Sequence, residues 1–413
     1  LRYGFEGVET HEYAWKLVRY LCLFALGALA LSYLGGRNMW FRRLDRFLAI
    51  PLLISTPIAS NAFGYLLHAS DGNALVAEYA VGQIAGERAK PRNLLLIYVE
   101  SGERTFSELA GGSDFFGDMN AIAAKGLDIR GIRQLENTSW TIAGMVASQC
   151  GVPLQPAGSL ARNKLGSRDS FLPNVTCLGD ILKRRGYSLT FIGGADLAFA
   201  GKGKFLSQHG YDELFGRTEL QQRAGDYLNQ WGLYDDTLFE VAQEKLRNLA
   251  KQDRPYVLSI LTVGGHFPEG FPTRSCMDKF GPADTKQILF AVKCTGFHVR
   301  QFIETAEQKG LLKNTVVVVM SDHLVMKNAV SNQLDRLDRM NYFAVIGEDI
   351  APEVRTKNSA TIDVFPTLLE LMGFDVPGRT AGLGVSLLSP EPSLTEKYGN
   401  DALNDMIKYG YAR

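Results

Sequence analysis

The chain has 413 residues, enough for a large hydrophobic core and for two or three domains. Lys plus Arg and Asp plus Glu number 44 each, so the chain lacks the excess positive charge that is typical of nucleic-acid-binding proteins. The sequence starts at Leu1, without an initiator Met or the charged start of a signal peptide, and we expect it to be the C-terminal part of a longer protein.

Two apolar segments near the start predict a transmembrane hairpin. Residues 18–34 carry a single charge, and residues 47–67 are apolar with two prolines, which membrane helices tolerate. The connecting loop contains four arginines, which by the positive-inside bias places it in the cytoplasm and everything after residue 67 on the outer face. Two buried helices of a soluble domain would also be apolar, but would not explain the arginines. We therefore interpret residues 1–70 as the end of a membrane domain.

The remaining sequence predicts a linker, an α/β domain and a tail. Residues 71–92 are alanine-rich and are expected to form a linker helix, and residues 391–413 a C-terminal tail. Between them, apolar runs of strand length alternate with segments of helical periodicity, which indicates βαβ units and a largely parallel sheet over 93–390. The expected strands are 93–100, 188–194, 256–263, 315–321 and 342–347, and the clearest helices are 178–186, 236–252 and 290–310.

Four of the five cysteines lie in the outer part of the chain. Proximity favours Cys150 with Cys177 and Cys276 with Cys294, although four cysteines allow three pairings. An oxidising compartment would permit such disulfides. Of the other histidines in this part, His209 is expected to support a turn and His298 to be structural.

Acidic and imidazole side chains follow three of the predicted strands. Glu100 ends the first strand, His266 follows the strand at 256–263, and Asp322 and His323 follow a run of four valines. Because ligands bind at the carboxyl ends of strands in open α/β sheets, we expect these side chains to share one rim and to hold a divalent metal. For the Asp-His pair alone, an N-cap with an incidental histidine is an equally good explanation.

The segment 136–154 offers a nucleophile. Thr138, Ser139 and Thr141 precede an apolar run that predicts a buried helix, so their hydroxyls would lie at its N-terminus, where phosphate binds well. An ordinary N-cap is the alternative for this short motif.

Several motifs in order resemble one known family. VESGERTF, TSWTIAGMVASQCGVPL, WGLYDDTLFEVA, LTVGGHFPEGF and SDHLVMKN are similar to the phosphoglycerol transferase I family, which modifies osmoregulated periplasmic glucans. That family belongs to the alkaline phosphatase and sulfatase superfamily, with the lipoteichoic acid synthases and the lipid A phosphoethanolamine transferases. The resemblance covers residues 93–388 and implies a sulfatase-like α/β domain with a mainly parallel central sheet flanked by helices.

The resemblance assigns the metal site and the nucleophile. It implies Glu100, Asp322 and His323 as metal ligands, and Thr138 as the nucleophile that also binds the metal, with Thr141 as the second choice. Mn²⁺ is the expected ion, with Mg²⁺ or Zn²⁺ as alternatives.

It also assigns the substrate-binding residues. His266 would bind substrate and protonate the leaving group, Trp231 would line the headgroup site, and Asp235 or Asp236 would lie nearby. Relatives tend to have Thr-His followed by a polar residue where this chain has Gly265-His266-Phe267, so the route of the proton is open.

The implied function is transfer of phosphoglycerol from phosphatidylglycerol to a periplasmic glucan, by an inner-membrane enzyme whose catalytic domain lies in the periplasm. A phosphoethanolamine transferase or a lipoteichoic acid synthase-like enzyme is the alternative within the superfamily, and a non-catalytic glucan-binding module is the alternative from another class. A sulfatase is disfavoured because Cys150 is followed by GVPL, which lacks the arginine of the C-x-P-x-R signature.

Overall fold

A mixed sheet forms the centre of the domain. The computed structural model describes residues 72–410 apart from 88, 156–162, 168–169 and 283–286, and these residues include an eight-stranded sheet of order β5-β4-β6-β2-β7-β8-β3-β9. Only β8 runs antiparallel to its neighbours. The strands are β2 (Asn93–Val99), β3 (Leu127–Arg133), β4 (Ser188–Gly193), β5 (Glu213–Phe215), β6 (Tyr256–Leu261), β7 (Thr315–Ser321), β8 (Phe343–Ile346) and β9 (Glu353–Ala360).

The middle of this sheet is buried on both faces. Every residue of β6 and β7 is buried, as are all but the first of β2. β-Branched and leucine-rich runs suit this position because helices cover both sides of a parallel sheet. The prediction of a largely parallel sheet is confirmed, because only the pairings of β8 are antiparallel.

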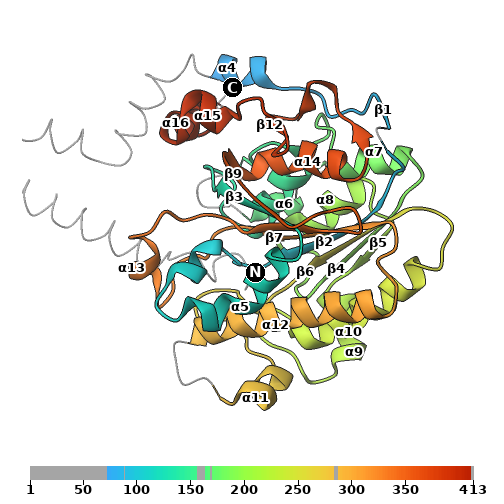
Figure 1. Ribbon diagram of the computed structural model, residues 1–413, viewed down its shortest axis with the longest axis vertical. Coiled ribbons are helices and arrows are strands. Elements are labelled where there is room, and N and C mark those ends of the chain that lie inside the picture. Colours follow the sequence, from blue (N-terminus) through green and yellow to red (C-terminus); the bar gives the residue numbers. More distant parts are fainter. Residues whose placement is uncertain (1–71, 88, 156–162, 168–169, 283–286, 411–413) are drawn as a thin grey trace, which may run out of the picture. The chain divides into compact units, whose positions relative to one another are not determined.

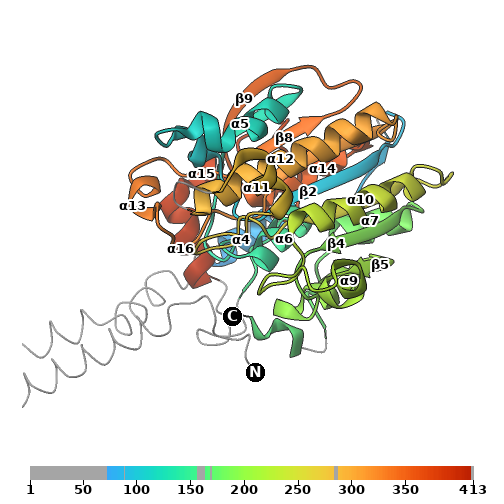
Figure 2. The same ribbon diagram turned by 90° about the horizontal axis from the view of Figure 1, so that it is seen from below.

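Helices pack on the two faces of the sheet (Figure 1). One face carries α5 (Gly112–Ala123), α10 (Asp235–Leu249) and α12 (Gln287–Gln308). The other carries α6 (Thr141–Cys150), α7 (Leu178–Arg184) and α14 (Val364–Leu371). Figure 2, seen from below, shows α10 and α12 in front of the strands.

The predicted linker and tail differ from the observed structure. The helix that begins the described part, α4 (Gly72–Glu78), is short, and the chain then continues without helix to β1 (Gly86–Glu87), which pairs with β10 (Phe374–Asp375). Gly82, Gly86 and Pro91 disfavour a longer helix. The expected tail forms α15 (Leu394–Tyr398) and α16 (Asn400–Gly410), and Ser393 Oγ donates to the carbonyl of Asn358 on β9 at 2.6 Å.

The predicted transmembrane hairpin lies outside the described residues. Within the part of the chain that the structure describes, no helix is both long and apolar enough to span a bilayer.

Both favoured disulfides are present. Cys150 pairs with Cys177 and Cys276 with Cys294. The first joins the end of α6 to the start of α7, and the second fastens the short helix α11 (Arg274–Phe280) to α12.

Candidate metal centre and nucleophile

The register of two neighbouring strands brings the predicted metal ligands together. β2 and β7 pair in parallel with Val99 opposite Ser321, so the residues that follow them, Glu100 and Asp322, are neighbours. With His323 they form a buried trio whose ligand atoms all lie within 4.8 Å of one another. His323 Nε2 lies 3.3 Å from Glu100 Oε1 and 3.4 Å from Asp322 Oδ2.

The remaining hydrogen bonds of the trio leave free the atoms that a cation would need. Asp322 Oδ1 accepts from the backbone N–H groups of Ser101 and His323 at 2.8 Å, whereas Oδ2 is buried and accepts no hydrogen bond. His323 Nδ1 lies 2.8 Å from the carbonyl of Leu324, which fixes the N–H there and leaves Nε2 as a donor of electrons to a metal. Two carboxylates and one imidazole, with one carboxylate oxygen that has no hydrogen-bond partner, fit a site for a divalent ion.

The charges of the trio are mutually dependent. Burial raises the pKa of Asp322 to about 8, helped by the charge of Glu100. Burial would lower the pKa of His323, but the two carboxylates outweigh it and raise the pKa to about 10. Burial likewise opposes ionisation of Glu100, yet the charge of His323 holds its pKa well below the usual range. Because metal ligands must be deprotonated, an incoming cation would displace these protons.

One backbone conformation in the site is strained. Ser101, directly after Glu100, has φ of 56°, a left-handed value that non-glycine residues rarely adopt. In this conformation its N–H reaches Asp322 Oδ1 and its hydroxyl donates to Glu100 Oε1 at 3.0 Å. The left-handed conformation of Ser101 therefore lets one residue hydrogen-bond both carboxylates.

The structure places Thr141, and not Thr138, against the metal ligands. Thr141 is the first residue of α6, and its hydroxyl donates to Glu100 Oε2 at 3.2 Å. The hydroxyl of Thr138 is buried and serves a turn, donating to the carbonyl of Leu135 at 2.8 Å and accepting from its N–H at 3.0 Å. These contacts favour Thr141 over Thr138 as the candidate nucleophile, because the hydroxyl of Thr138 already pairs with the backbone.

Gly144 allows helix α6 to approach the metal ligands closely. A Cβ at this position would lie 1.8 Å from the carbonyl oxygen of Asp322, so only glycine fits. Deeper along the helix, Ser148 and Gln149 hydrogen-bond the buried hydroxyl of Tyr98 on β2. The helix that presents Thr141 is thus fixed to both ligand-bearing strands.

His266 lies on the loop after β6, next to Glu100. β6 pairs with β2 on the side opposite to β7, and the N–H of Glu100 donates to Thr262 Oγ1 at 2.9 Å. Gly265 permits the close approach, since a Cβ there would lie 2.3 Å from the carbonyl oxygen of Glu100. His266 Nδ1 lies 2.8 Å from the carbonyl of Phe267, and burial lowers the pKa of the imidazole. The neutral ring then offers Nε2 as a proton acceptor.

Trp231 contacts His266. The two ring centroids are 4.1 Å apart, and Phe199 packs edge-on against the indole at 5.2 Å. The indole Nε1 is buried without a hydrogen-bond partner. An unpaired buried donor beside the candidate catalytic histidine is available to a ligand.

Asp235 acts on the protein backbone instead of facing a substrate. Its Oδ1 accepts from the N–H of Val263 at 2.8 Å, and its Oδ2 accepts from Gly264 at 3.1 Å and from the Thr295 hydroxyl at 2.9 Å. Burial raises its pKa to about 6. Both oxygens are occupied, so this residue positions the loop that carries His266, and the predicted substrate contact is not supported.

Lys202 is the site residue that the sequence interpretation missed. It begins α8 (Lys202–Gln208), which follows β4 on the same rim of the sheet, and it is only 3% exposed. Burial lowers its pKa to about 8, against the opposing charges of Glu100, Asp196 and Asp322. A lysine shortly after the carboxyl end of a buried strand was the available signal.

Comparison with known proteins identifies the family. The model of the sulfatase family matches residues 92–374, which is more than half of the chain. The chain belongs to the sulfatase family. This agrees with the position of its candidate metal ligands after the central strands of the sheet.

Two curated relatives of this sulfatase-family chain are named phosphoglycerol transferase I. A phosphoglycerol transferase I of Xanthomonas campestris pv. campestris (strain B100) is 36% identical over 433 residues, an alignment that covers 100% of this chain and 60% of the relative. A phosphoglycerol transferase I of Citrobacter koseri is 41% identical over 313 residues, covering 75% and 40%. The chain therefore spans about half the length of these relatives.

A solved structure shares the fold. The lipoteichoic acid synthase LtaP from Listeria monocytogenes superimposes with a TM-score of 0.59 at 17% identity, over 78% of this chain and 81% of that one. At this identity the likeness supports the alkaline phosphatase-like fold alone, which the resemblance of the motifs had implied.

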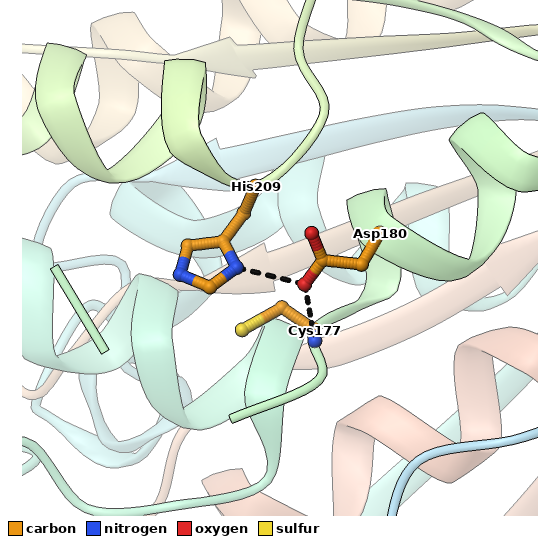
Figure 3. Close-up of side chains that lie close together, drawn as sticks. All are labelled: Cys177, Asp180 and His209. Carbon is orange, nitrogen blue, oxygen red and sulfur yellow. Dashed lines mark hydrogen bonds and ion pairs between the residues drawn. The ribbon is translucent and has the colours of Figure 1, made fainter. Parts of the chain in front are cut away.

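A second group of potential ligands in the sulfatase-family domain serves structure (Figure 3). Cys177, Asp180 and His209 lie close together, but the sulfur of Cys177 is already bonded to Cys150. Asp180 Oδ2 accepts from the N–H of Cys177 and contacts His209 Nδ1, both at 2.8 Å, and His209 Nε2 lies 2.9 Å from the carbonyl of Phe171. Each potential ligand thus has a partner in the protein, and the prediction that His209 supports local structure fits these contacts.

Proposed function

We propose that this chain is the catalytic part of a metal-dependent transferase that moves phosphoglycerol from phosphatidylglycerol to a hydroxyl group of a glucan. The observation that carries the proposal is the hydroxyl of Thr141, which lies at the N-terminus of α6 and donates to a carboxylate of the buried metal-binding trio. Free N–H groups and the helix dipole at this end favour a phosphate group. The names of the curated relatives support the choice of phosphoglycerol.

Thr141 is the proposed nucleophile, and the neighbouring side chains supply charge and proton transfer. When bound by Glu100, Asp322 and His323, a divalent cation would lower the pKa of the hydroxyl and offset the phosphodiester charge. Mn²⁺ is our first expectation, and Mg²⁺ or Zn²⁺ also suit this donor set. Lys202 adds a positive charge for the non-bridging phosphate oxygens.

The reaction proceeds in two displacements at phosphorus. Thr141 Oγ1 gives up its proton and bonds to phosphorus, the bond to the diacylglycerol oxygen breaks, and the released proton passes by way of His266 to the leaving oxygen, so that Thr141 carries phosphoglycerol. A sugar hydroxyl then attacks the same phosphorus and Thr141 regains its proton. The lowered pKa of His266 suits it to accept the proton of the sugar hydroxyl in this second step.

The proposal also covers the setting of the reaction. Trp231, against His266, would line the binding site of the glycerol headgroup. Anchoring by the predicted hairpin would hold the domain at the outer face of the inner membrane, in the periplasm, close to its lipid donor. The two disulfides fit an oxidising compartment.

Intact mass of the full chain after incubation with phosphatidylglycerol and Mn²⁺ tests this function. We expect a phosphoglycerol adduct on the natural protein and on Thr138→Val, and none on Thr141→Val, because valine keeps the shape of threonine and removes the hydroxyl. An adduct that persists in Thr141→Val but disappears in Thr138→Val would move the nucleophile to Thr138.

Two further arms separate the alternatives. An adduct formed from phosphatidylethanolamine in place of phosphatidylglycerol would indicate a phosphoethanolamine transferase. If neither lipid gives an adduct or releases diacylglycerol, with any of the three metal ions, the transferase function is wrong and a glucan-binding module is favoured.

A further inference from the structure

An aromatic stack outside the reaction centre continues from the loop that carries Trp231. Leu228 and Leu233 form an antiparallel bridge, and the side chain of Asn229 accepts from the N–H groups of Trp231 and Gly232 at 2.8 and 3.0 Å. These bonds make residues 228–233 a tight hairpin whose tip carries Trp231 against His266.

Two tyrosines stack at the base of this hairpin. The rings of Tyr227 and Tyr234 are 4.4 Å apart and nearly parallel, with 10° between their planes. The guanidinium of Arg274, from the start of α11, lies 4.3 Å from the centre of the Tyr227 ring. We call these three side chains the aromatic ledge. Both tyrosines are half-buried and Arg274 is exposed, so the ledge borders solvent and is not part of the core.

Polar groups at the edge of the aromatic ledge are already ordered. The hydroxyl of Tyr227 accepts from the N–H of Arg274 at 2.8 Å and donates to Asp236 Oδ2 at 3.1 Å. The same oxygen accepts from the exposed Ser275 hydroxyl at 2.9 Å. Thr273 caps α11, which the disulfide between Cys276 and Cys294 fastens to α12. The ledge is therefore held in place before any ligand binds, which lowers the entropic cost of binding.

We infer that the aromatic ledge binds the sugar units of the acceptor next to the unit that is modified. A sugar ring has an apolar C–H face that packs on aromatic rings, and hydroxyl groups at its edge that pair with an exposed donor such as the guanidinium of Arg274. Trp231 and Tyr234 are three residues apart, so their Cα atoms are separated by at most about 10 Å, and the ledge lies within reach of a chain whose terminal unit is at His266. This inference rests on the proposed function and names the part of the glucan that the protein recognises.

The binding arm of the test needs no catalysis. Titration of the full chain with a long gluco-oligosaccharide and with methyl glucoside, in a calorimeter, is compared for the natural protein, Tyr234→Ala and Arg274→Ala. We expect both variants to bind the long oligosaccharide about tenfold more weakly, which is the effect of losing one stacking contact. Their affinity for methyl glucoside should equal that of the natural protein. Tyr398→Ala is the matched control, a half-buried tyrosine that hydrogen-bonds Glu78 away from the ledge. Equal affinity of all four proteins for the long chain would overturn the inference.

The kinetic arm distinguishes substrate binding from support of Trp231. Loading of Thr141 from phosphatidylglycerol, measured without acceptor, should be unchanged in Tyr234→Ala and Arg274→Ala, whereas the KM for the long acceptor should rise about tenfold. If loading falls together with transfer, the ledge only positions the hairpin and the inference is wrong. Absence of loading in the natural protein would instead refute the proposed function, while the binding arm would still decide the ledge.

Discussion

Gly144 offers a sharp test of how the nucleophile helix meets the metal ligands. Replacing it with alanine adds one methyl group in the middle of α6, where alanine is otherwise the better helix former by about 1 kcal/mol. The new Cβ would lie 1.8 Å from the carbonyl oxygen of Asp322 and 2.8 Å from its carbonyl carbon. Both atoms are backbone, so the clash cannot be relieved by rotating a side chain.

The expected size of the effect follows from this distance. To reach the 3.0 Å below which Cβ contacts are essentially never found, α6 and the backbone of Asp322 must separate by about 1.2 Å. Overpacking of a well-filled interior costs about 1–3 kcal/mol, and a backbone clash belongs at the upper end of that range. After the helix-propensity gain, we expect Gly144→Ala to lose about 1–2 kcal/mol of stability. Displacement of Asp322 should weaken metal binding by about 10–100-fold.

Urea denaturation and Mn²⁺ titration of the same samples measure both quantities. Gly117→Ala is the matched control, because Gly117 lies inside α5 and a Cβ there would meet no atom within 4 Å. We expect that variant to gain about 0.5–1 kcal/mol and to bind Mn²⁺ like the natural protein.

Two results would refute this reasoning. If Gly144→Ala were as stable as Gly117→Ala, α6 would not be in contact with the backbone of Asp322. If Gly144→Ala lost stability but kept its Mn²⁺ affinity, Asp322 would not be a ligand whose position depends on that contact.

Three further predictions concern stability and the position of the catalytic loop. Burial lowers the pKa of His298 to about 4, so the unfolded chain binds more protons and stability falls as the pH drops from about 6.5 towards 4. Urea denaturation should show that His298 makes the free energy of unfolding about 2 kcal/mol lower at pH 5 than at pH 7.5, and that the decrease is smaller in His298→Gln. Equal decreases in the natural protein and the variant would contradict the prediction. Replacing Cys150 and Cys177 by serine should cost about 3–4 kcal/mol, because the closed loop spans 27 residues, and unchanged thermal unfolding would contradict it. Asp235→Asn should lower the transfer rate by about 10²-fold with folding retained by circular dichroism, since an amide cannot accept all three hydrogen bonds; an unchanged rate would show that the loop of His266 does not depend on it.

The central strands were predictable from sequence because burial on both faces leaves a strong pattern. The four valines of β7 and the leucines of β2 have no polar alternation, and their strands lie where the runs predicted. β9, at the edge of the sheet, was missed for the opposite reason. β3 was missed although most of its residues are buried, because Asp128, Arg130 and Arg133 interrupt its apolar pattern. β9 reads EVRTKNSA with its first six residues at least partly exposed, and a register shift interrupts its pairing with β3. A solvated edge strand carries little hydrophobic signal.

The grouping of the three candidate metal ligands was also predictable, whereas the identity of the threonine beside them was not. Glu100, Asp322 and His323 follow strands that pair in parallel, so the end of each strand fixes the position of the residue after it. The choice between Thr138 and Thr141 depends on where the helix begins. Trp140 is extended and Thr141 is the first helical residue, while Thr138 belongs to the preceding turn. Both threonines precede the same apolar run, and helix boundaries are the least certain part of a sequence interpretation.

The roles of Lys202 and Asp235 depend on contacts between segments far apart in the sequence. Lys202 lies 102 positions after Glu100 in the chain. The two charges interact only because β4 and β2 are the two neighbours of β6 in the sheet. Asp235 follows Trp231 closely in the chain, which made it resemble a substrate contact, but its carboxylate turns towards Val263 and Gly264. Asp235, although charged and beside a binding motif, therefore supports a neighbouring loop. Only the number of protein hydrogen bonds that it already makes distinguishes the two roles.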